Sequence, residues 1–505
     1  MIYTEKKAYP SKGNTLLHFV NEDSLKTDLF LNQLNKLVNN RINRQIELHN
    51  FKGNINEYIY VEGADAYEHI IIYGLGKSKE FTSIKLRDAV AHITQIGQSF
   101  KSMSLSLFYL PLFGKEYFDV GKNISLGYEL GQYSFDKFKS KEEIKDKKII
   151  KELYIYFEND IPDTFNKGVK FGETLAKGIS LTRNLVNEPA SHVHPETLVK
   201  EAFAIEKKSD GKVTVEILDK DECERLGMGS FLGVAQGSDR EAKFIILKYN
   251  RNSNDKTQIS KVKKICLVGK SITFDSGGLS LKPSKSMETM KMDMAGGATV
   301  LGIFDILTKS DITSYEVWGI LPACENMPSG RALRPGDVVK GLNGKTIEVL
   351  NTDAEGRLAL ADAVAYAEKH IKPDLIIDLA TLTGACMVAL GPDIAGLFGN
   401  DRLAIKQFLH HAKKEGEEVW ELPLYKPYLK TLKSDIADIK NIGGTGYGGA
   451  ISGALFIGEF VKKTPWLHID IAGPAYGSHN TKSIISKNGT GWGVLSIISL
   501  LSTNT

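Results

Sequence analysis

The sequence contains little cysteine and no cysteine pairs. Its 505 residues include four cysteines, and none of them forms a C-x-x-C pair: Cys223, Cys266, Cys324 and Cys386. This scarcity excludes a zinc knuckle and a disulfide framework, so a reducing, cytoplasmic compartment is expected. The first thirteen residues are polar and lack the apolar core of a signal peptide, so export is not expected.

Long hydrophobic runs and an excess of charge are also missing. The longest apolar runs, such as 265–268 and 375–377, are far shorter than the roughly 18 residues that a membrane span requires. Basic residues number 64 and acidic residues 61, a near balance that argues against a dedicated nucleic-acid or membrane-surface protein. With 42% hydrophobic and 25% charged residues, the composition is typical of a soluble globular protein with small or neutral partners.

Alternating strand and helix patterns predict an α/β fold. Short β-rich runs at 70–73 and 105–110 flank an amphipathic stretch at 83–101, which is the order of a βαβ unit. Further along, apolar residues recur at steps of three and four between Phe165 and Val186 and predict a long helix. Strand-like runs then alternate with helical stretches such as 357–370, which predicts a mixed, largely parallel sheet covered by helices.

These patterns predict two domains. We expect a smaller N-terminal α/β domain at residues 1–164, a connecting helix at 165–190, and a larger C-terminal domain at 191–505 that holds the mixed sheet. Candidate acids and metal ligands are concentrated in the C-terminal part, so any catalytic site is expected there.

Residues 268–271, Val-Gly-Lys-Ser, resemble the end of a phosphate-binding loop. A P-loop requires a glycine five residues before its last glycine, and Lys264 stands at that position, so this nucleotide-binding interpretation is excluded. An acid followed by a glycine pair comes next, in Phe274-Asp-Ser-Gly-Gly278. Open α/β sheets place their sites at such strand ends.

Acidic residues stand in three separate, glycine-rich segments that are otherwise apolar: Asp275, Asp293, Asp353 and Glu355. Burying carboxylates is costly unless they are paired or bind metal, and two divalent cations would neutralise four of them. A dinuclear metal site is therefore predicted. Oxygen ligands without histidine or thiolate allow magnesium, manganese, cobalt or zinc. The absence of H-E-x-x-H excludes the common helical zinc-protease motif.

Three basic residues, Lys270, Lys282 and Arg357, lie in the same segments. Each could simply form a salt bridge. If metal ions neutralise the acids, the positive charges of Lys282 and Arg357 remain unbalanced. They could then stabilise a bound anion or a developing oxyanion. The planar fork of Arg357 matches a carboxylate-like or carbonate-like guest. Lys270 could ligate a metal, because a neighbouring dication would favour loss of its proton.

The segment Asn351-Thr-Asp-Ala-Glu-Gly-Arg-Leu358 closely resembles the signature of the leucyl (cytosol) aminopeptidase family, whose members are dinuclear metallo-exopeptidases. The similarity is expected from about residue 165 to the end, whereas the N-terminal domain shows only short similar pieces at 74–76 and 127–131. Further similar segments stand in the family order at 227–229, 236–238, 272–278, 325–330, 334–337, 380–384 and 470–473.

The resemblance implies a role for each matching residue. Two divalent ions, manganese or zinc in the first place and otherwise magnesium or cobalt, would be held by Lys270, Asp275, Asp293, Asp353 and Glu355. Lys282 and Arg357 would be the catalytic pair, and Arg357 would hold a bicarbonate ion that acts as general base. An apolar pocket for the substrate side chain would be formed by Met290, Thr381, Leu382, Gly384 and Ala472.

The implied activity is release of leucine and other apolar residues from peptides with a free N-terminus. The resemblance also implies a homohexamer built as a dimer of trimers. The charge balance argues against a membrane or nucleic-acid partner. One alternative is a family member that acts chiefly as a DNA-binding or scaffold protein. Another alternative is a two-metal phosphatase. An aminopeptidase requires a free amine on its substrate, and a phosphatase does not, so this requirement distinguishes the two.

One position departs from the family pattern. Ser271 stands where relatives usually carry glycine after the first lysine. If this position needs a positive φ, the serine would be strained and could tilt Lys270, which would weaken metal binding. His192 and His194 are spaced like a metal pair, but they precede a proline and are interpreted as bystanders.

Overall fold

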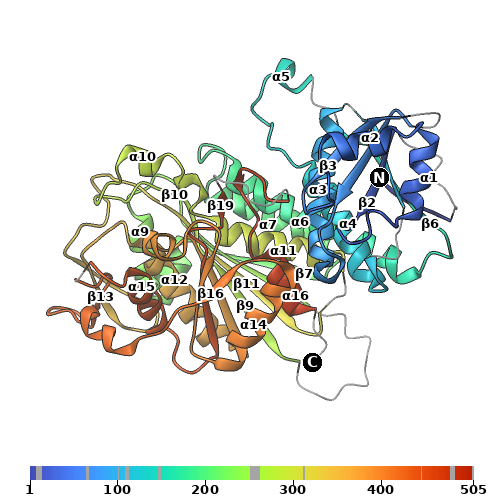
Figure 1. The fold of residues 1–505 in the computed structure, drawn as a ribbon. Helices are drawn as coiled ribbons and strands as arrows, with labels where there is room; N and C mark the ends of the chain where they lie inside the picture. The colour runs from blue at the N-terminus through green and yellow to red at the C-terminus, as the bar shows by residue number, and fades with distance from the viewer. Residues whose placement is uncertain are drawn as a thin grey trace. The chain divides into compact units, whose positions relative to one another are not determined.

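The computed structural model describes residues 1–6, 14–63, 67–100, 102–108, 113–145, 149–250, 262–310, 313–444, 446–477 and 484–502. The chain forms two compact units (Figure 1). The first comprises Met1–Ala176 with Asn480–Ser486, and the second comprises Lys177–His479 with Lys487–Thr505.

A six-stranded sheet in the order β1-β6-β5-β2-β4-β3 organises the first unit. All its pairings are parallel except that of β3 with β4. Buried aliphatic and aromatic side chains of the strands and of α3 and α4 form its core. The strands are β1 (Ile2–Lys6), β2 (Thr15–Val20), β3 (Tyr58–Glu62), β4 (His69–Gly74), β5 (Ser104–Phe108) and β6 (Glu152–Phe157). The helices are α1 (Leu29–Leu37), α2 (Arg41–Leu48), η1 (Ser78–Glu80), α3 (Ser83–Ser99), α4 (Tyr117–Gly131), α5 (Lys141–Lys145) and α6 (Asp163–Asn187), the last of which continues into the second unit.

A nine-stranded sheet in the order β16-β15-β18-β14-β9-β11-β8-β7, with β10 paired to β11, organises the second unit. Its centre, β18-β14-β9-β11-β10, is parallel, whereas β15, β8 and β7 pair antiparallel with their inner neighbours. The strands of this sheet are β7 (Val213–Leu218), β8 (Lys243–Tyr249), β9 (Lys264–Gly269), β10 (Ser271–Asp275), β11 (Glu316–Asn326), β14 (Leu375–Ala380), β15 (Ala395–Gly399), β16 (Val419–Glu421) and β18 (Trp466–Asp470). Smaller sheets contain β12 (Asp337–Lys340), β13 (Thr346–Val349), β17 (Ile439–Lys440), β19 (Tyr476–Gly477) and β20 (Asn488–Gly489).

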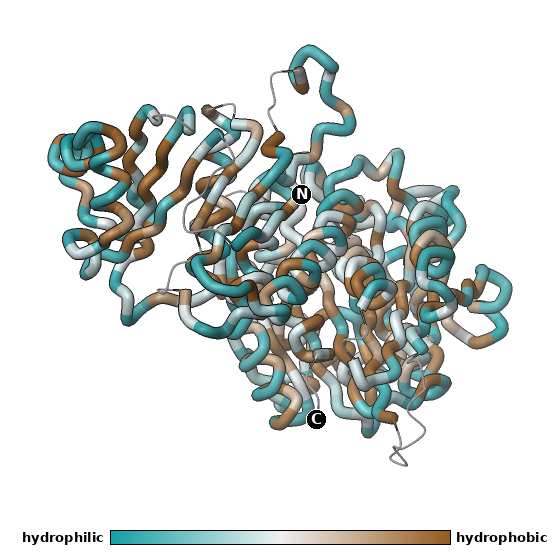
Figure 2. Tube along the Cα trace, turned by 90° about the vertical axis from the view of Figure 1, so that its right-hand side faces the viewer, coloured by the Kyte–Doolittle hydropathy of each residue, from teal (hydrophilic) through white to brown (hydrophobic). Residues whose placement is uncertain are grey.

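Helices cover both faces of the nine-stranded sheet. The helices α7, α11, α14 and α16 pack on one face, and α9, α12 and α15 pack on the other. The bounds are α7 (Pro195–Lys208), α8 (Lys220–Leu226), α9 (Gly229–Ala235), α10 (Ser284–Met287), η3 (Met290–Met292), α11 (Ala295–Leu307), α12 (Glu355–Tyr366), η4 (Ala367–Ile371), α13 (Gly384–Leu390), α14 (Arg402–Glu415), η5 (Lys426–Leu432), α15 (Gly449–Gly458) and α16 (Val494–Leu501). Figure 2 shows the hydrophobic colour along the strands and the hydrophilic colour along outer helices and turns.

The predicted fold class is confirmed: both units are α/β, and the C-terminal sheet is mixed and largely parallel. The predicted connecting helix corresponds to α6, and the division between the compact units falls within it, after Ala176. The domain boundaries at residues 164 and 190 stay predictions. The four cysteines are buried and free. No helix in the described ranges has the length and apolar character needed to cross a bilayer.

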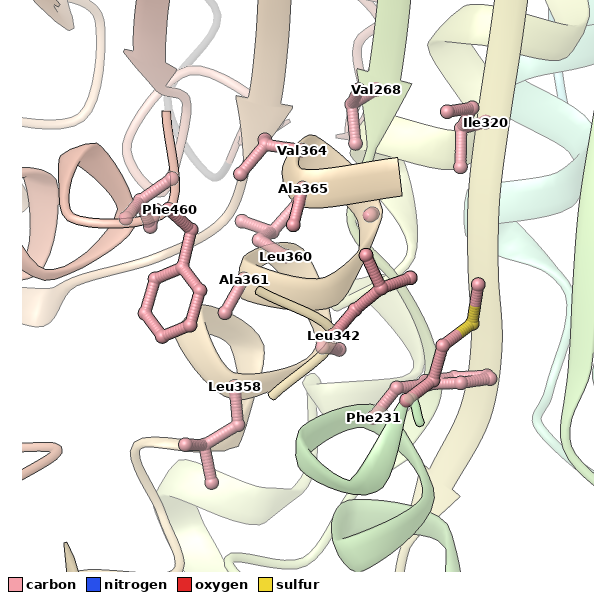
Figure 3. Close-up of a cluster of buried hydrophobic side chains, with 14 of the residues drawn as sticks. Phe231, Val268, Ile320, Leu342, Leu358, Leu360, Ala361, Val364, Ala365 and Phe460 are labelled. Carbon is pink, nitrogen blue, oxygen red and sulfur yellow. The ribbon is translucent and has the colours of Figure 1, made fainter. Parts of the chain in front are cut away.

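Helix α12 is almost completely buried near the strand ends. Its side chains Leu358, Leu360 and Val364 are fully buried in a cluster with Phe231 of α9 and Val268 of β9 (Figure 3). Burial of each such side chain contributes about 1.5 to 3 kcal/mol. The first turn of α12 is therefore held firmly at the carboxyl edge of the sheet.

Candidate metal and catalytic centre

Three parallel strands bring the predicted site residues to one edge of the sheet. Strand β11 pairs first with β9 and then with β10, and Lys270 lies at the break between these two strands. Asp275 is the last residue of β10, and Thr381 follows the end of β14. Since the carboxyl ends of parallel strands share an edge, residues far apart in sequence meet here.

Helices supply the other side chains. Asp293 precedes α11 by two residues, and Glu355 is the first residue of α12. Between Glu355 and Arg357, the glycine at 356 has a steric purpose. A Cβ at Gly356 would lie 2.4 Å from Cε of Lys270 and 2.6 Å from its Nζ, so only glycine lets the lysine reach this place.

Three of the four predicted acids form a compact buried cluster. One carboxylate oxygen from each of Asp275, Asp293 and Glu355 lies within 4.8 Å of the other two, and the three residues are only 2–3% exposed. Asp353 is half-buried beside them, with a side chain that is 32% exposed. The structure therefore brings together all four acids, three as an inner cluster and one toward the surface.

Two lysines connect these acids. Nζ of Lys270 lies 2.7 Å from Oδ1 of Asp293 and 2.9 Å from Oε1 of Glu355, and it also donates to the carbonyl oxygen of Thr381 at 2.9 Å. Nζ of Lys282 lies 2.9 Å from Oδ2 of Asp275.

Lys282 also forms an ion pair with Asp353. It therefore ties the outer acid to the inner cluster.

The cluster is more acidic than its lysines can balance, which fits a site for divalent cations. Four carboxylates face two ammonium groups, and an unpaired buried charge is costly. Oδ2 of Asp293 and Oε2 of Glu355 are buried and have no hydrogen-bond partner among the described residues. Carboxylate oxygens left free in this way are the ligands that divalent cations prefer.

The titration behaviour reflects the same excess of acid. Burial raises the pKa of Asp293 well above its ordinary value, and the nearby carboxylates of Glu355 and Asp275 raise it further, against the effect of Lys270. Burial and Glu355 likewise raise the pKa of Asp275. For Lys270, burial favours the neutral amine, but Asp293 and Glu355 outweigh it and hold the pKa above the ordinary value.

Arg357 lies next to the cluster with one donor unused. Its Nη1 donates to the carbonyl oxygen of Asn441 at 2.9 Å, and the residue is 8% exposed. Nε is buried and has no hydrogen-bond partner in the described part of the chain. Burial lowers the pKa of Arg357, and the carboxylates of Glu355 and Asp470 oppose this effect. An arginine with a free donor can hold an additional anion.

The five predicted pocket residues stand in η3 and in the segments that follow β14 and β18. Met290, Leu382 and Ala472 are half-buried and Gly384 is exposed, as expected for walls of an open pocket. Thr381 is buried, and its hydroxyl donates to Oδ1 of Asp293 at 2.7 Å. The side chain of Thr381 therefore supports the acid cluster. The assignment of the pocket stays a prediction.

The condition under which Ser271 would be strained, a positive φ, is not met. Ser271 is the first residue of β10 and is not among the residues with positive φ. Its buried hydroxyl donates to the carbonyl oxygen of Gly269 at 2.8 Å and fills the space beside Gly297. Lys270 is therefore not tilted by backbone strain. The reason is that residue 271 continues the extended strand and makes no turn.

Two residues near the cluster were not predicted. Nδ2 of Asn326 donates to Oδ1 of Asp275 at 2.8 Å and to the carbonyl oxygen of Thr352 at 3.0 Å. Asp470 is fully buried at the end of β18. Both stand in segments that carry the family resemblance, but an amide and an isolated acid gave no independent signal of a role. The histidine pair stays outside the centre, since Nδ1 of His194 contacts Glu196.

Comparison with known proteins agrees with this geometry. The model of the cytosol aminopeptidase family, catalytic domain, matches residues 180–498, and the model of the N-terminal domain of the same family matches residues 17–142. The chain is 40% identical over 472 residues to the probable cytosol aminopeptidase of Alkaliphilus metalliredigens, which covers 93% of this chain and 91% of the relative. It is 41% identical over 488 residues to that of Aquifex aeolicus, covering 96% and 94%. The similarity thus includes the N-terminal part, where the sequence showed only short pieces.

Solved structures are similar over almost the whole chain. A mutant of tomato leucine aminopeptidase superposes with a TM-score of 0.89 at 33% identity and covers 100% of this chain and 96% of its own. The bottromycin maturation enzyme BotP in complex with Mn superposes with a TM-score of 0.83 at 29% identity, covering 97% and 99%.

Proposed function

The chain belongs to the cytosol aminopeptidase family and is a metal-dependent aminopeptidase, and from this premise we propose that it releases leucine and other apolar residues from the N-termini of peptides by two-metal hydrolysis. One observation carries the proposal: three buried acids converge within 4.8 Å and leave carboxylate oxygens without partners among the described residues.

The metal ligands in this proposal are Lys270, Asp275, Asp293, Asp353 and Glu355. When bound, two divalent ions act as Lewis acids that polarise a carbonyl and lower the pKa of water. Manganese is supported by the complex of BotP with Mn, and zinc is the other leading candidate. Four carboxylates can neutralise two such ions, which would also release Lys282 from its ion pairs with the acids.

Lys282 and Arg357 perform the remaining steps in this proposal. Lys282 donates to the oxyanion that develops at the scissile carbonyl. Arg357 would hold a bicarbonate ion through donors that include the unpaired Nε, and the bound ion would supply a general base beside the metal ligands. This assignment gives the centre a base, although no histidine belongs to it.

The substrate is held by its side chain and by its free amino group. Apolar contacts with Met290, Leu382 and Ala472 favour leucine, but such pockets discriminate by only about 1 to 3 kcal/mol per methylene, so the preference should be broad. The free α-amine of the substrate would serve as a ligand to one of the ions, which an acylated nitrogen could not do. A blocked terminus should therefore lose both affinity and orientation.

The test is to strip the protein with a chelator and restore manganese, zinc, cobalt or magnesium separately while hydrolysis of leucine amide is followed. Activity should return with at least one ion and should require two equivalents per chain. N-acetyl-leucine amide under the same loading is the control. If the acetylated substrate is cleaved as fast as the free amine, or if the stripped protein stays fully active, the proposal is wrong.

The assembly proposed for the chain is a homohexamer made of two trimers in the cytoplasm. Sedimentation equilibrium should then give about six times the 55.8 kDa chain mass. DNA binding as the main function is not favoured, since the net charge is only +3. A steeply salt-dependent affinity for duplex DNA would reverse this judgement.

A further inference from the structure

Asp470 is a buried carboxylate that the proposed mechanism does not use. It is 0% exposed at the end of β18, and no lysine or arginine forms an ion pair with it within the described ranges. Its Oδ1 accepts from the backbone nitrogens of Leu382, Thr383 and Ala472 at 3.2, 3.4 and 3.1 Å. Its Oδ2 accepts from the hydroxyl of Thr383 at 2.7 Å. Backbone and hydroxyl donors therefore compensate this charge.

These bonds join the two segments that follow adjacent strands. Ala380 of β14 pairs in register with Asp470 of β18, so the chain leaves both strands at the same point of the sheet edge. The hydroxyl of Thr383 also accepts from the backbone nitrogen of Cys386 at 3.0 Å and thereby caps the start of α13. Asp470 thus fixes the direction of the 381–384 segment, and it holds Ala472 through the same carboxylate.

The 381–384 segment serves the acid cluster and the predicted pocket together. The carbonyl oxygen of Thr381 accepts a hydrogen bond from Nζ of Lys270 at 2.9 Å, and the hydroxyl of Thr381 donates to Oδ1 of Asp293. Leu382, Gly384 and Ala472 are predicted pocket residues, and Asp470 contacts the backbone of two of the three. The acid cluster is also held by ion pairs with Lys270 and Lys282, so a shift of the 381–384 segment should affect the predicted pocket walls more than the cluster.

We propose that Asp470 and Thr383 are positioning residues that set the width of the side-chain pocket and so the selectivity of the enzyme. The inference rests on the proposed aminopeptidase function. Neither residue needs to touch the substrate. If Thr383 loses its hydroxyl, the start of α13 loses its cap, the carboxylate of Asp470 loses its shortest bond, and Leu382 and Gly384 can move away from Ala472.

The experiment compares Thr383→Val, Thr383→Ser and Asp470→Asn with the wild-type holoenzyme. Valine keeps the shape and removes the hydroxyl, and serine keeps the hydroxyl and both of its bonds. Each protein is assayed on leucine amide and alanine amide, and its bound metal is counted by mass spectrometry. We expect Thr383→Val and Asp470→Asn to lower the ratio of kcat/KM for leucine amide over alanine amide by about tenfold, since a hydrogen bond to a charged group is lost. The loss should lie in KM for leucine amide, with metal content as in the wild type.

Thr383→Ser should restore selectivity to within about twofold of the wild type, because the charge-assisted bond is kept. The inference is overturned if Thr383→Val keeps the wild-type ratio, or if it loses metal and both activities in equal measure, which is what a merely structural role would give. If Asp470→Asn fails to fold, the selectivity ratios and metal contents of Thr383→Val and Thr383→Ser alone test the inference. A wild-type enzyme without activity on leucine amide after metal restoration refutes the proposed function instead, so the two failures are distinguishable.

Discussion

Glu355→Gln tests how the charge balance of the acid cluster affects metal binding, because the substitution leaves the size of the side chain unchanged. The substitution keeps the size of a side chain that is 2% exposed and removes one negative charge from the acid cluster. It should affect the metal-free and metal-loaded proteins very differently. In the metal-free protein, the repulsion that is relieved between the acids at least offsets the attraction to Lys270 that is lost. The metal-loaded protein, in contrast, loses a ligand in the proposed site.

The magnitudes follow from the distances. At an effective dielectric constant of about 20, two like charges no more than 4.8 Å apart repel by about 3.5 kcal/mol or more, and Glu355 has two such neighbours, Asp275 and Asp293. Its attraction to Lys270 at 2.9 Å amounts to about 6 kcal/mol on the same scale. The relieved repulsion is at least as large as the lost attraction, so Glu355→Gln should not destabilise the metal-free protein by more than about 1 kcal/mol.

The assay is thermal unfolding of the chelated protein during titration with manganese. A ligand at about 100 times its Kd stabilises a protein by about 2.7 kcal/mol per site. The wild type should show this stabilisation, and Glu355→Gln should show it only at far higher manganese concentrations. Ser329→Ala, in the exposed turn after β11, serves as a matched control that leaves the carboxylates intact.

Equal manganese-dependent stabilisation of the wild type and Glu355→Gln would refute the reasoning. A large destabilisation of the chelated variant would refute it too, because the repulsion between the acids would then be smaller than the distances indicate.

Three further predictions concern neighbouring residues. Lys282→Met should lower kcat by about 100- to 1,000-fold, since a donor to the oxyanion is lost, while the metal content found by mass spectrometry stays unchanged. Asn326→Ala should weaken metal binding about 10- to 100-fold in competition with a fluorescent chelator, because Asp275 loses the donor that orients it. The carboxylate of Asp378, 2.6 Å from His468, raises the pKa of that buried histidine above 6.5 against the effect of burial. The unfolding free energy measured in urea should therefore be highest below pH 6.5 and fall as the pH rises through the raised value. Asp378→Asn should abolish this dependence and cost about 3 to 5 kcal/mol.

The structure brings together the four acids that the sequence singled out, and each of them lies in a glycine-rich segment: Asp275 at a strand end, and the others just before or at the start of a helix. The sequence did not single out Asn326 and Asp470, whose roles depend on distances across the sheet that no local pattern encodes. The backbone conformation at Ser271 could not be settled from the sequence for a similar reason. Only the pairing of β11 with both β9 and β10 shows that residue 271 continues a strand. The residue types in a segment can indicate its chemistry, whereas the pairing register between distant strands cannot be predicted from any one segment.

The close approach of Lys270 to Gly356 has an evolutionary consequence. Alanine is generally more favourable than glycine in a helix, so selection for stability alone would favour alanine at this position in the first turn of α12. Here the methyl group of alanine would occupy the place of the lysine stem, 2.4 Å away. A substitution that is harmless in most helices would therefore displace Lys270 from the acids that it contacts.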